Sequence, residues 1–213
     1  MTACPAKGAR KPRADAVRNR ERVLAAAKLV FGQGGEAASL EAVARQAGVG
    51  IGTLYRHFPT REALFEAVYR REVEQLVDLA EALRTEASPA EALRRWMRAI
   101  VEFVATKKGM VAALAIVVKG SSDLMAYSQD RLTRAVEALL RRAAEAGEIR
   151  RDIGPEDLLR TVIGLCYAQD RPDWQETVLR LLDVFMDGLR RRPDADQREA
   201  QGGLFAPAAG PRR

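Results

Sequence analysis

Apolar residues recur at three- and four-residue steps along most of this chain of 213 residues, and this period predicts helices. The first stripe ends at Gly32–Gly35, and a long one runs from Thr60 to about Thr85. A capping box with proline at the first helical position predicts a helix from Ser88 to about Thr106. Later helices are expected from Gly154 to about Ala168 and from Pro172 to the arginines at 190–192. The pattern therefore predicts an all-α protein.

The segment 39–58 contains two short predicted helices joined by a tight turn. The first helix carries an apolar stripe of Leu40, Val43, Ala44 and Ala47, and Ser39 can cap it with its hydroxyl. Gly48 follows the last apolar residue, and glycine readily adopts the left-handed conformation that ends a helix. A chain that reverses in about three residues between short helices is typical of a helix-turn-helix, the motif that reads DNA in the major groove.

The second short helix has one face for the core and one for readout. Leu54 and Phe58 lie on one side of it, with Ile51 at the edge. The opposite face carries Gly52, Thr53 and Arg56, and the two flanks carry Tyr55 and His57. A phenol and an imidazole on the flanks can reach phosphates on either side of a groove. We therefore expect this helix to read DNA with its outward face.

This segment resembles the signature of the tetracycline repressor (TetR) family. The matching residues are Ser39, Val43–Ala44, Ala47–Val49, Gly52–Tyr55 and His57–Pro59, within a resemblance that covers roughly Arg18 to Arg71. The resemblance implies a homodimer whose N-terminal three-helix domains lie in successive major grooves of a palindromic, double-stranded operator. It also implies a helical C-terminal domain that binds a small-molecule effector, which changes the spacing of the two DNA-binding domains.

By the same resemblance, several residues fall on positions that usually touch DNA. They are Ser39, Gly52, Thr53, Tyr55, His57 and Arg61. Many members have a serine where this chain has Gly50, and often a lysine where it has Ile51, so two common polar contacts are missing. This difference concerns the operator sequence rather than the class of protein. With the outward-facing arginine, the candidate DNA-binding residues are Ser39, Gly50, Ile51, Gly52, Thr53, Tyr55, Arg56, His57 and Arg61.

The net charge of +6 is concentrated in the first third of the chain. Residues 1–71 carry 13 of the 35 Lys and Arg but only 6 of the 29 Asp and Glu. Such confinement is expected of a surface that binds phosphates. The plainer explanation of a high pI is a proteome rich in arginine. Residues 1–16 lack a hydrophobic period and predict a disordered basic arm, which contacts DNA or is simply a loose terminus.

We expect the helix-turn-helix domain to span residues 17–71, a helical effector-binding and dimerisation domain 72–192, and a disordered tail 193–213. No apolar run approaches the roughly 20 residues that span a bilayer, and the charged start lacks the hydrophobic stretch of a signal peptide. A cytoplasmic protein without membrane partners is therefore expected. Cys4 and Cys166 have no second thiol or histidine nearby in sequence, so no metal site, disulfide or cofactor is indicated.

The effector pocket is expected among the helices of the C-terminal domain, where large and adaptable side chains can line a cavity for an apolar ligand. The candidates are Trp96, Met97, Phe103, Lys107, Met110, Tyr127, Cys166 and Tyr167. Each one is also compatible with an ordinary core position. A lysine such as Lys107 near a cavity would favour an anionic ligand, and the alternative is a solvated helix end.

Two late amphipathic helices, Asp157–Ala168 and Asp173–Arg191, have more apolar surface than a small domain needs on one side. We expect them to form a four-helix bundle with the same helices of a second chain. The alternative is that they pack only into their own core. The candidate interface residues are Leu158, Val162, Leu165, Trp174, Val178, Leu182, Phe185 and Leu189.

An enzymatic function is not supported by the sequence. The only histidine, His57, lies in the predicted recognition helix, so a Ser-His-Asp or Cys-His arrangement would need a residue that DNA binding already explains. The glycines at 32–35 lack the lysine and following Ser or Thr of a phosphate-binding loop. A helical adaptor that has lost DNA binding is the alternative, but that loss should also erase the basic bias of residues 1–71. The sequence therefore predicts a DNA-binding repressor that its effector releases.

Overall fold

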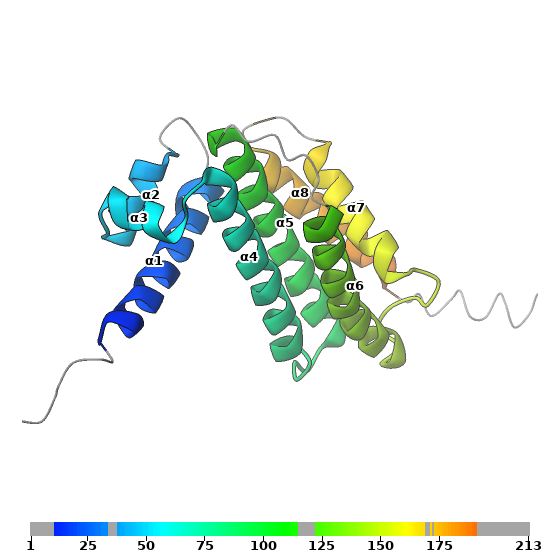
Figure 1. Ribbon diagram of the computed structural model, residues 1–213. Coiled ribbons are helices and arrows are strands. Elements are labelled where there is room, and N and C mark those ends of the chain that lie inside the picture. Colours follow the sequence, from blue (N-terminus) through cyan, green and yellow to red (C-terminus); the bar gives the residue numbers. More distant parts are fainter. Residues whose placement is uncertain (1–10, 34–37, 115–121, 169–170, 172, 191–213) are drawn as a thin grey trace, which may run out of the picture.

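The computed structural model describes residues 11–33, 38–114, 122–168, 171 and 173–190. Within these ranges the chain forms eight helices and no strand, which confirms the predicted all-α fold (Figure 1). The helices are α1 (Lys11–Gln33), α2 (Leu40–Ala47), α3 (Ile51–His57), α4 (Arg61–Leu83), α5 (Pro89–Leu114), α6 (Ser122–Glu145), α7 (Pro155–Tyr167) and α8 (Trp174–Leu189).

Two helix bounds differ from the sequence-based expectation. Helix α1 begins at Lys11, within the segment 1–16 that was expected to be a disordered arm, because Pro12 is well tolerated in a first helical turn. Helix α5 continues past Thr106 to Leu114. Residues 1–10 and 191–213, which hold the rest of the predicted arm and all of the predicted tail, lie outside the described residues.

The first three helices and the start of α4 share one group of buried side chains. Its members include Val23, Ala27 and Phe31 of α1, Val43 of α2, Leu54 of α3 and Leu64 of α4. Helix α1 packs against α2, α3, α4 and α5, so it connects the helix-turn-helix to the rest of the molecule. In Figure 1, α2 and α3 form a separate lobe beside α1.

Helices α4, α5 and α6 lie side by side in the remainder of the chain, and α7 and α8 cover α5 (Figure 1). Trp96 of α5 is fully buried, and its indole N–H donates to the Leu76 carbonyl of α4 at 2.8 Å. Helix α4 runs without interruption from the helix-turn-helix to the far end of this bundle. Helix α4 is therefore a continuous connection between the N-terminal lobe and the bundle.

The N-terminus of α5 is held by a residue distant in sequence. The Ser88 hydroxyl oxygen accepts from the amide of Glu91 at 3.3 Å, as the capping box predicts. The carboxylate that completes the cap comes from Glu148, which accepts from the amide of Ala90 at 2.8 Å and from the Ser88 hydroxyl at 3.1 Å. This contact fastens the end of α6 to the start of α5.

Candidate DNA-binding surface and ligand-binding domain

The turn of the helix-turn-helix is built around Gly48. Its φ of 62° lies in the left-handed region, and its amide donates to the Arg45 carbonyl at 3.0 Å, which closes the end of α2. A Cβ at this position would lie 2.4 Å from Nη2 of Arg22. The Arg22 guanidinium in turn donates to the Gly48 carbonyl oxygen at 3.3 Å. The turn therefore needs glycine for its left-handed conformation, whereas the flexible end of the Arg22 side chain could move away from an added Cβ.

Helix α3 buries one side and leaves the other open. Leu54 and Phe58 are buried in the lobe. Arg56 is exposed and forms no hydrogen bond or ion pair in the described part of the chain. Ile51 and Tyr55, one turn apart, are 39% and 43% exposed. Of the outward face predicted from the sequence, Gly52 and Arg56 are exposed and Thr53 is half-buried. The exposed face also includes Ile51, which was expected at the edge of the core.

Several other candidate DNA-binding residues lie at helix ends. The Ser39 hydroxyl oxygen accepts from the amide of Ala42 at 3.1 Å and caps α2, so its O–H remains a donor. Arg61 is the first residue of α4. A Cβ added at Gly50 or Gly52 would meet nothing within 4 Å. The start of α3 is therefore uncovered by the described chain.

The flank of α3 and the C-terminal end of the helix are held by aromatic and cationic contacts. His57 is half-buried, and its ring centroid lies 6.3 Å from that of Phe58. The Arg20 guanidinium of α1 lies 4.8 Å from the centroid of the Phe58 ring. Thr53, one turn before His57, is half-buried.

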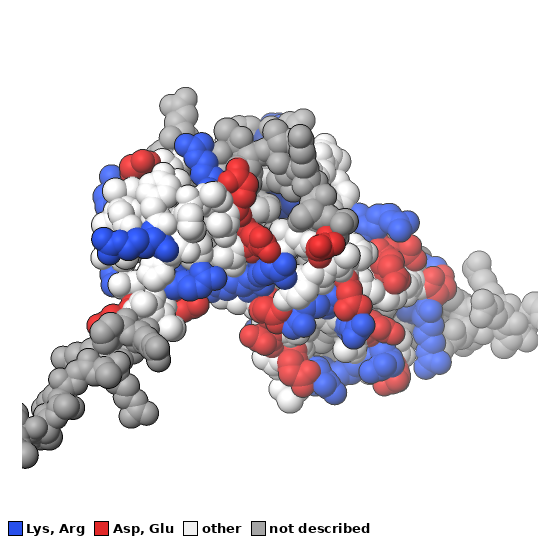
Figure 2. Space-filling view, viewed as in Figure 1, with Lys and Arg blue, Asp and Glu red and all other residues white. Residues whose placement is uncertain are grey.

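Figure 2 shows that the lobe of α2 and α3 presents mainly uncharged surface, with Lys and Arg and a few Asp or Glu side chains around it. The face of α4 to α7 seen in the same view is a mosaic of both signs. Positive charge around an uncharged helix face suits DNA, because cations engage phosphates while the helix face meets base edges.

A buried ion pair joins the N-terminal lobe to α4. Nζ of Lys28 in α1 lies 2.5 Å from Oε2 of Glu72, whose side chain is 4% exposed. The other oxygen of Glu72 has no hydrogen-bond partner in the described structure. Sequence reasoning missed this pair, although an acidic residue on the apolar stripe of α4, beside Tyr69 and Val73, is a readable signal.

A second junction joins α1 to α5 through a glycine that sequence reasoning also missed. A Cβ on Gly109 would lie 1.7 Å from the carbonyl oxygen of Phe31 and 2.8 Å from its carbon. The two helix backbones therefore approach so closely that only glycine fits at this point of α5. The contact places the end of α1 directly on the same turn of α5 as Lys107.

The structure places the candidate pocket residues in two groups, with Tyr127 apart from both. Trp96, Met97 and Met110 are buried with at most 1% exposure and serve as core. Tyr127 lies elsewhere, on the side of α6 that faces α4, where its hydroxyl donates to Glu74. The remaining candidates, Phe103, Lys107, Cys166 and Tyr167, lie around Tyr69 and the end of α5.

Tyr69 of α4 is the centre of this second group. Its buried hydroxyl donates to Oγ of Ser128 at 2.9 Å, and burial raises the pKa of Tyr69 while the hydrogen bond opposes that rise. Its ring centroid lies 5.2 Å from that of Phe103. Burial also raises the pKa of the free Cys166 thiol to about 11, with Lys108 opposing the shift. The thiol therefore stays protonated at neutral pH and is no nucleophile.

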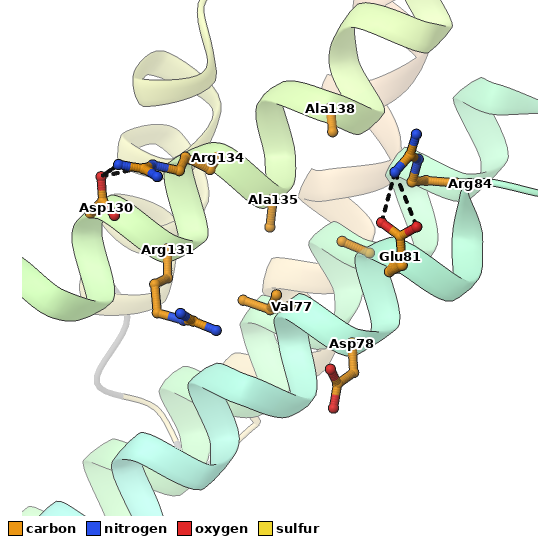
Figure 3. Close-up of a pocket in the computed structure, with 10 residues that line it drawn as sticks. Val77, Asp78, Glu81, Arg84, Asp130, Arg131, Arg134, Ala135 and Ala138 are labelled. Atoms are coloured by element: carbon orange, nitrogen blue, oxygen red, sulfur yellow. Dashed lines mark hydrogen bonds and ion pairs between the residues drawn. The ribbon is translucent and has the colours of Figure 1, made fainter.

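A groove of about 400 Å³ lies between α4 and α6, away from these residues (Figure 3). Its lining includes Val77 and Ala135. Two ion pairs along it lie within one helix, Glu81 with Arg84 and Asp130 with Arg134, whereas Arg131 of α6 pairs with Glu74 of α4. None of the candidate pocket residues lines the groove.

The candidate interface residues on α7 and α8 require a correction. Leu158, Val162, Val178, Leu182 and Leu189 are buried within this single chain, so they form its own core and offer no surface to a second chain. Leu165, Trp174 and Phe185 are half-buried. The exposed apolar residues on the outer side are Tyr167, Leu181 and Val184, the last of which is 71% exposed. The apolar stripe of α8 that contains Leu182 therefore faces the interior of this chain, and Leu181 and Val184 beside it face outward.

Two further features concern metal and membrane binding by the residues that the structure describes. No group of three or more His, Cys, Asp or Glu side chains in that part is placed to hold a metal ion. None of its helices combines the length and the apolar character needed to cross a bilayer.

Two family models match the chain. Residues 23–68 match the model of bacterial regulatory proteins of the tetR family. Residues 88–191 match the C-terminal domain of SbtR-like transcriptional regulators. The two matches together cover the helix-turn-helix and helices α5 to α8.

Curated relatives are transcriptional regulators. The activator FasR of Mycolicibacterium smegmatis is 33% identical over 99 residues, which are 46% of this chain and 44% of FasR. The regulator UidR of Escherichia coli K12 is 28% identical over 159 residues, which are 70% of this chain and 78% of UidR. The match to FasR thus spans less than half of that protein.

Solved structures match this chain over a larger share of its length than these two curated relatives do. The TetR transcriptional regulator SCO0520 from Streptomyces coelicolor is 47% identical with a TM-score of 0.70, covering 80% of this chain and 98% of its own. A TetR transcription regulatory protein from Mycobacterium vanbaalenii is 36% identical with a TM-score of 0.62, and the match covers 84% of this chain and 99% of the other.

Proposed function

This chain belongs to the TetR family of bacterial transcriptional regulators, and on that premise we propose that it is a ligand-responsive repressor. It binds a palindromic operator as a homodimer and leaves the operator when a small molecule binds. The observation that carries the proposal is the open outer face of α3 above a buried Leu54 and Phe58. Such a helix can enter the major groove while its inner face stays in the lobe.

Base readout and phosphate contact are assigned to different residues. Arg56 extends outward from α3 and forms no ion pair in the described residues, so it is available for a base edge. Arg61, at the first turn of α4, and Tyr55, on the exposed flank, are assigned to phosphates.

A comparison of two arginine variants tests this assignment on an operator selected from genomic DNA. Arg56→Ala should weaken operator binding by about 1–3 kcal/mol and leave binding to random DNA nearly unchanged. Arg61→Ala should weaken binding to all sequences and reduce the salt slope by roughly one unit. If Arg56→Ala leaves the ratio of operator affinity to random-DNA affinity unchanged, the assignment of Arg56 to base readout is wrong. Wild-type protein that selects no operator contradicts DNA regulation and favours an adaptor.

The dimer is proposed to form through the outer face of α7 and α8. Leu181 and Val184 are exposed apolar residues on α8, and a Cβ at Gly164 or Gly188 would meet nothing within 4 Å. An exposed apolar stripe with open glycines permits close approach of the same two helices from a second chain.

Sedimentation tests this interface. Val184→Lys should yield a folded monomer that binds the operator weakly, because the substitution places a charge in the proposed interface and touches no internal core. Leu182→Ala is the matched core variant, because Leu182 is fully buried within the chain, and it should lose about 2–5 kcal/mol of stability instead. A wild-type chain that is monomeric at micromolar concentration contradicts the proposal.

Release by the effector follows from the two junctions between the lobe and the bundle. Helix α4 continues from the lobe into the bundle, and α1 touches α5 at Gly109. Half-sites lie about 34–36 Å apart, so a small tilt of either helix spoils the fit to successive grooves. A small molecule, proflavine, is bound in the structure of the neighbour LfrR from Mycobacterium smegmatis, which supports a ligand-binding role for this fold.

A further inference from the structure

The side chain of Lys107 on α5 is a half-buried cation with an aromatic neighbour and no acidic one. Its ammonium lies 5.7 Å from the centroid of the Tyr69 ring. No carboxylate in the described part of the chain forms an ion pair with it. Burial lowers the pKa of Lys107, and no charge or hydrogen bond opposes that shift. A cation that is partly removed from water without a counter-charge costs free energy.

Two other lysines, Lys28 and Lys108, have hydrogen-bond or ion-pair partners, and none is recorded for Lys107 among the described residues. Lys28 is paired with the buried carboxylate of Glu72 at 2.5 Å. Lys108, the next residue, donates to the Cys166 carbonyl oxygen at 3.2 Å and lies 4.5 Å from the centroid of the Trp174 ring. Lys107 therefore has the cation–π contact with Tyr69, but no hydrogen bond or ion pair in the described part of the chain satisfies its ammonium.

The groups around Lys107 are fixed by their own contacts. The Tyr69 hydroxyl donates to Ser128, and the Ser128 hydroxyl donates to the Met125 carbonyl at 2.9 Å, so the ring of Tyr69 is held in place. The Phe103 ring packs against this tyrosine in a tilted geometry, and Phe65 stacks on it with centroids 5.8 Å apart. The result is a cluster of three aromatic rings with the Lys107 ammonium beside it.

We propose that the effector is a monoanion, in the simplest case a carboxylate, whose charged group pairs with Lys107 and whose apolar body rests against Tyr69 and Phe103. The inference rests on the proposed function, namely that the C-terminal part binds an effector. A charge-assisted hydrogen bond to the anion supplies the partner that the ammonium lacks. The aromatic rings supply the apolar contact that ligand sites require.

The position also connects the anion to the DNA-binding lobe. Lys107 lies two residues before Gly109, where the backbone of α5 touches Phe31 of α1. An anion that draws Lys107 toward it moves the same helical turn that supports the end of α1. Effector binding is thus coupled to the orientation of the lobe through α1 as well as α4.

A panel of paired ligands tests the charge requirement: aryl and alkyl carboxylic acids, each with its primary amide. Binding to the purified wild-type protein is measured by calorimetry. At least one acid should bind roughly tenfold or more tightly than its amide, and Lys107→Met should abolish that preference while Lys108→Met retains it. Acids and amides that bind alike, or a preference that survives in Lys107→Met, overturn the inference. A panel in which no acid is preferred overturns it as well.

Thermal unfolding without ligand gives an independent readout. Lys107→Met should raise the melting temperature, because it removes an unpaired cation, whereas Lys108→Met should lower it, because it removes a hydrogen bond to Cys166. A lower melting temperature for Lys107→Met shows a structural partner and overturns the inference. Operator binding by ligand-free Lys107→Met should equal that of the wild type. Failure of wild-type operator binding would instead contradict the proposed function.

Discussion

On α3, Arg56 extends into solvent without an ion pair in the described residues, whereas on α5 Arg94 is enclosed by three carboxylates. Arg94 lies 2.8 Å from Asp183 and 2.6 Å from Asp187 of α8. The same type of side chain therefore serves an external partner in one region and fastens two helices in the other. The role of a charged side chain in this protein therefore depends on its neighbours. Net charge alone does not distinguish an arginine that can bind DNA from one that holds two helices together.

The largest expected effect concerns Lys28, a half-buried cation that joins α1 of the N-terminal lobe to α4. Lys28→Met leaves the carboxylate of Glu72 buried and unpaired, and one of its oxygens already lacks a partner. We expect a loss of about 3–5 kcal/mol in the free energy of unfolding, measured by denaturant titration. The double variant Lys28→Met/Glu72→Met should recover most of that loss, because apolar groups can replace a buried pair at little cost. A single variant as stable as the wild type would show that the pair does not hold α1 to α4.

The second largest effect is expected at Gly109, where the backbones of α1 and α5 touch. Gly109→Ala places a methyl group 1.7 Å from the Phe31 carbonyl oxygen, and a backbone atom cannot rotate away. We expect a loss of about 1–3 kcal/mol from overpacking and weaker operator binding, because α1 must shift. Gly52→Ala is the matched control for stability, because its Cβ would meet open space. Its stability should stay the same or rise by up to about 1 kcal/mol.

A smaller effect is expected on the outer face of α3, where Ile51 is exposed at the position that often carries a lysine in the family. An exposed branched apolar side chain there can contact the C5-methyl group of thymine. Replacing the contacted thymine by uracil removes one methyl group and should cost about 0.8 kcal/mol of operator affinity. The same replacement should have no effect on Ile51→Ser. Fluorescence anisotropy with operators substituted one thymine at a time measures both, and an operator insensitive to uracil at every position contradicts the contact.

The helix-turn-helix could be predicted from the sequence because its signals are local. Ser39 caps the helix that follows it, Gly48 has the left-handed conformation, and Leu54 faces the core, and each of these depends on neighbours within a few residues. The long helix α4 was predicted for the same reason, since Thr60 caps it and its apolar period is regular.

The C-terminal region was predicted less well because its arrangement depends on residues far apart in sequence. The period of α8 showed that Leu182 and Val184 lie on different faces, but not which face meets α5 and which is exposed. The cap of α5 comes from Glu148, and the close approach of α1 comes from Gly109, and neither has a local signal. Sequence periodicity therefore gave the helices, and only long-range packing decides which of their faces remain available.

The smallest expected effect concerns the ion pairs between Asp183 of α8 and the arginines of α5, and it is measured as a change of stability with pH. Arg98, which donates to the Asp183 carboxylate, holds the pKa of that group below its usual value; burial opposes the shift and Arg94 adds to it. A carboxylate with a lowered pKa stabilises the fold above its ordinary pKa near 3.9, and this contribution is lost as the pH falls through the lower folded value. The Asp183 side chain is 37% exposed, so solvent screening limits the effect to about 0.2–1 kcal/mol.

Asp183→Asn should therefore be slightly less stable than the wild type at pH 7, and the difference should shrink below about pH 4. Asp78→Asn is the control, because Asp78 is exposed on α4 and has no ion pair among the described residues. A stability difference for Asp183→Asn that is the same at pH 3 and pH 7 would show that Asp183 acts through packing rather than charge.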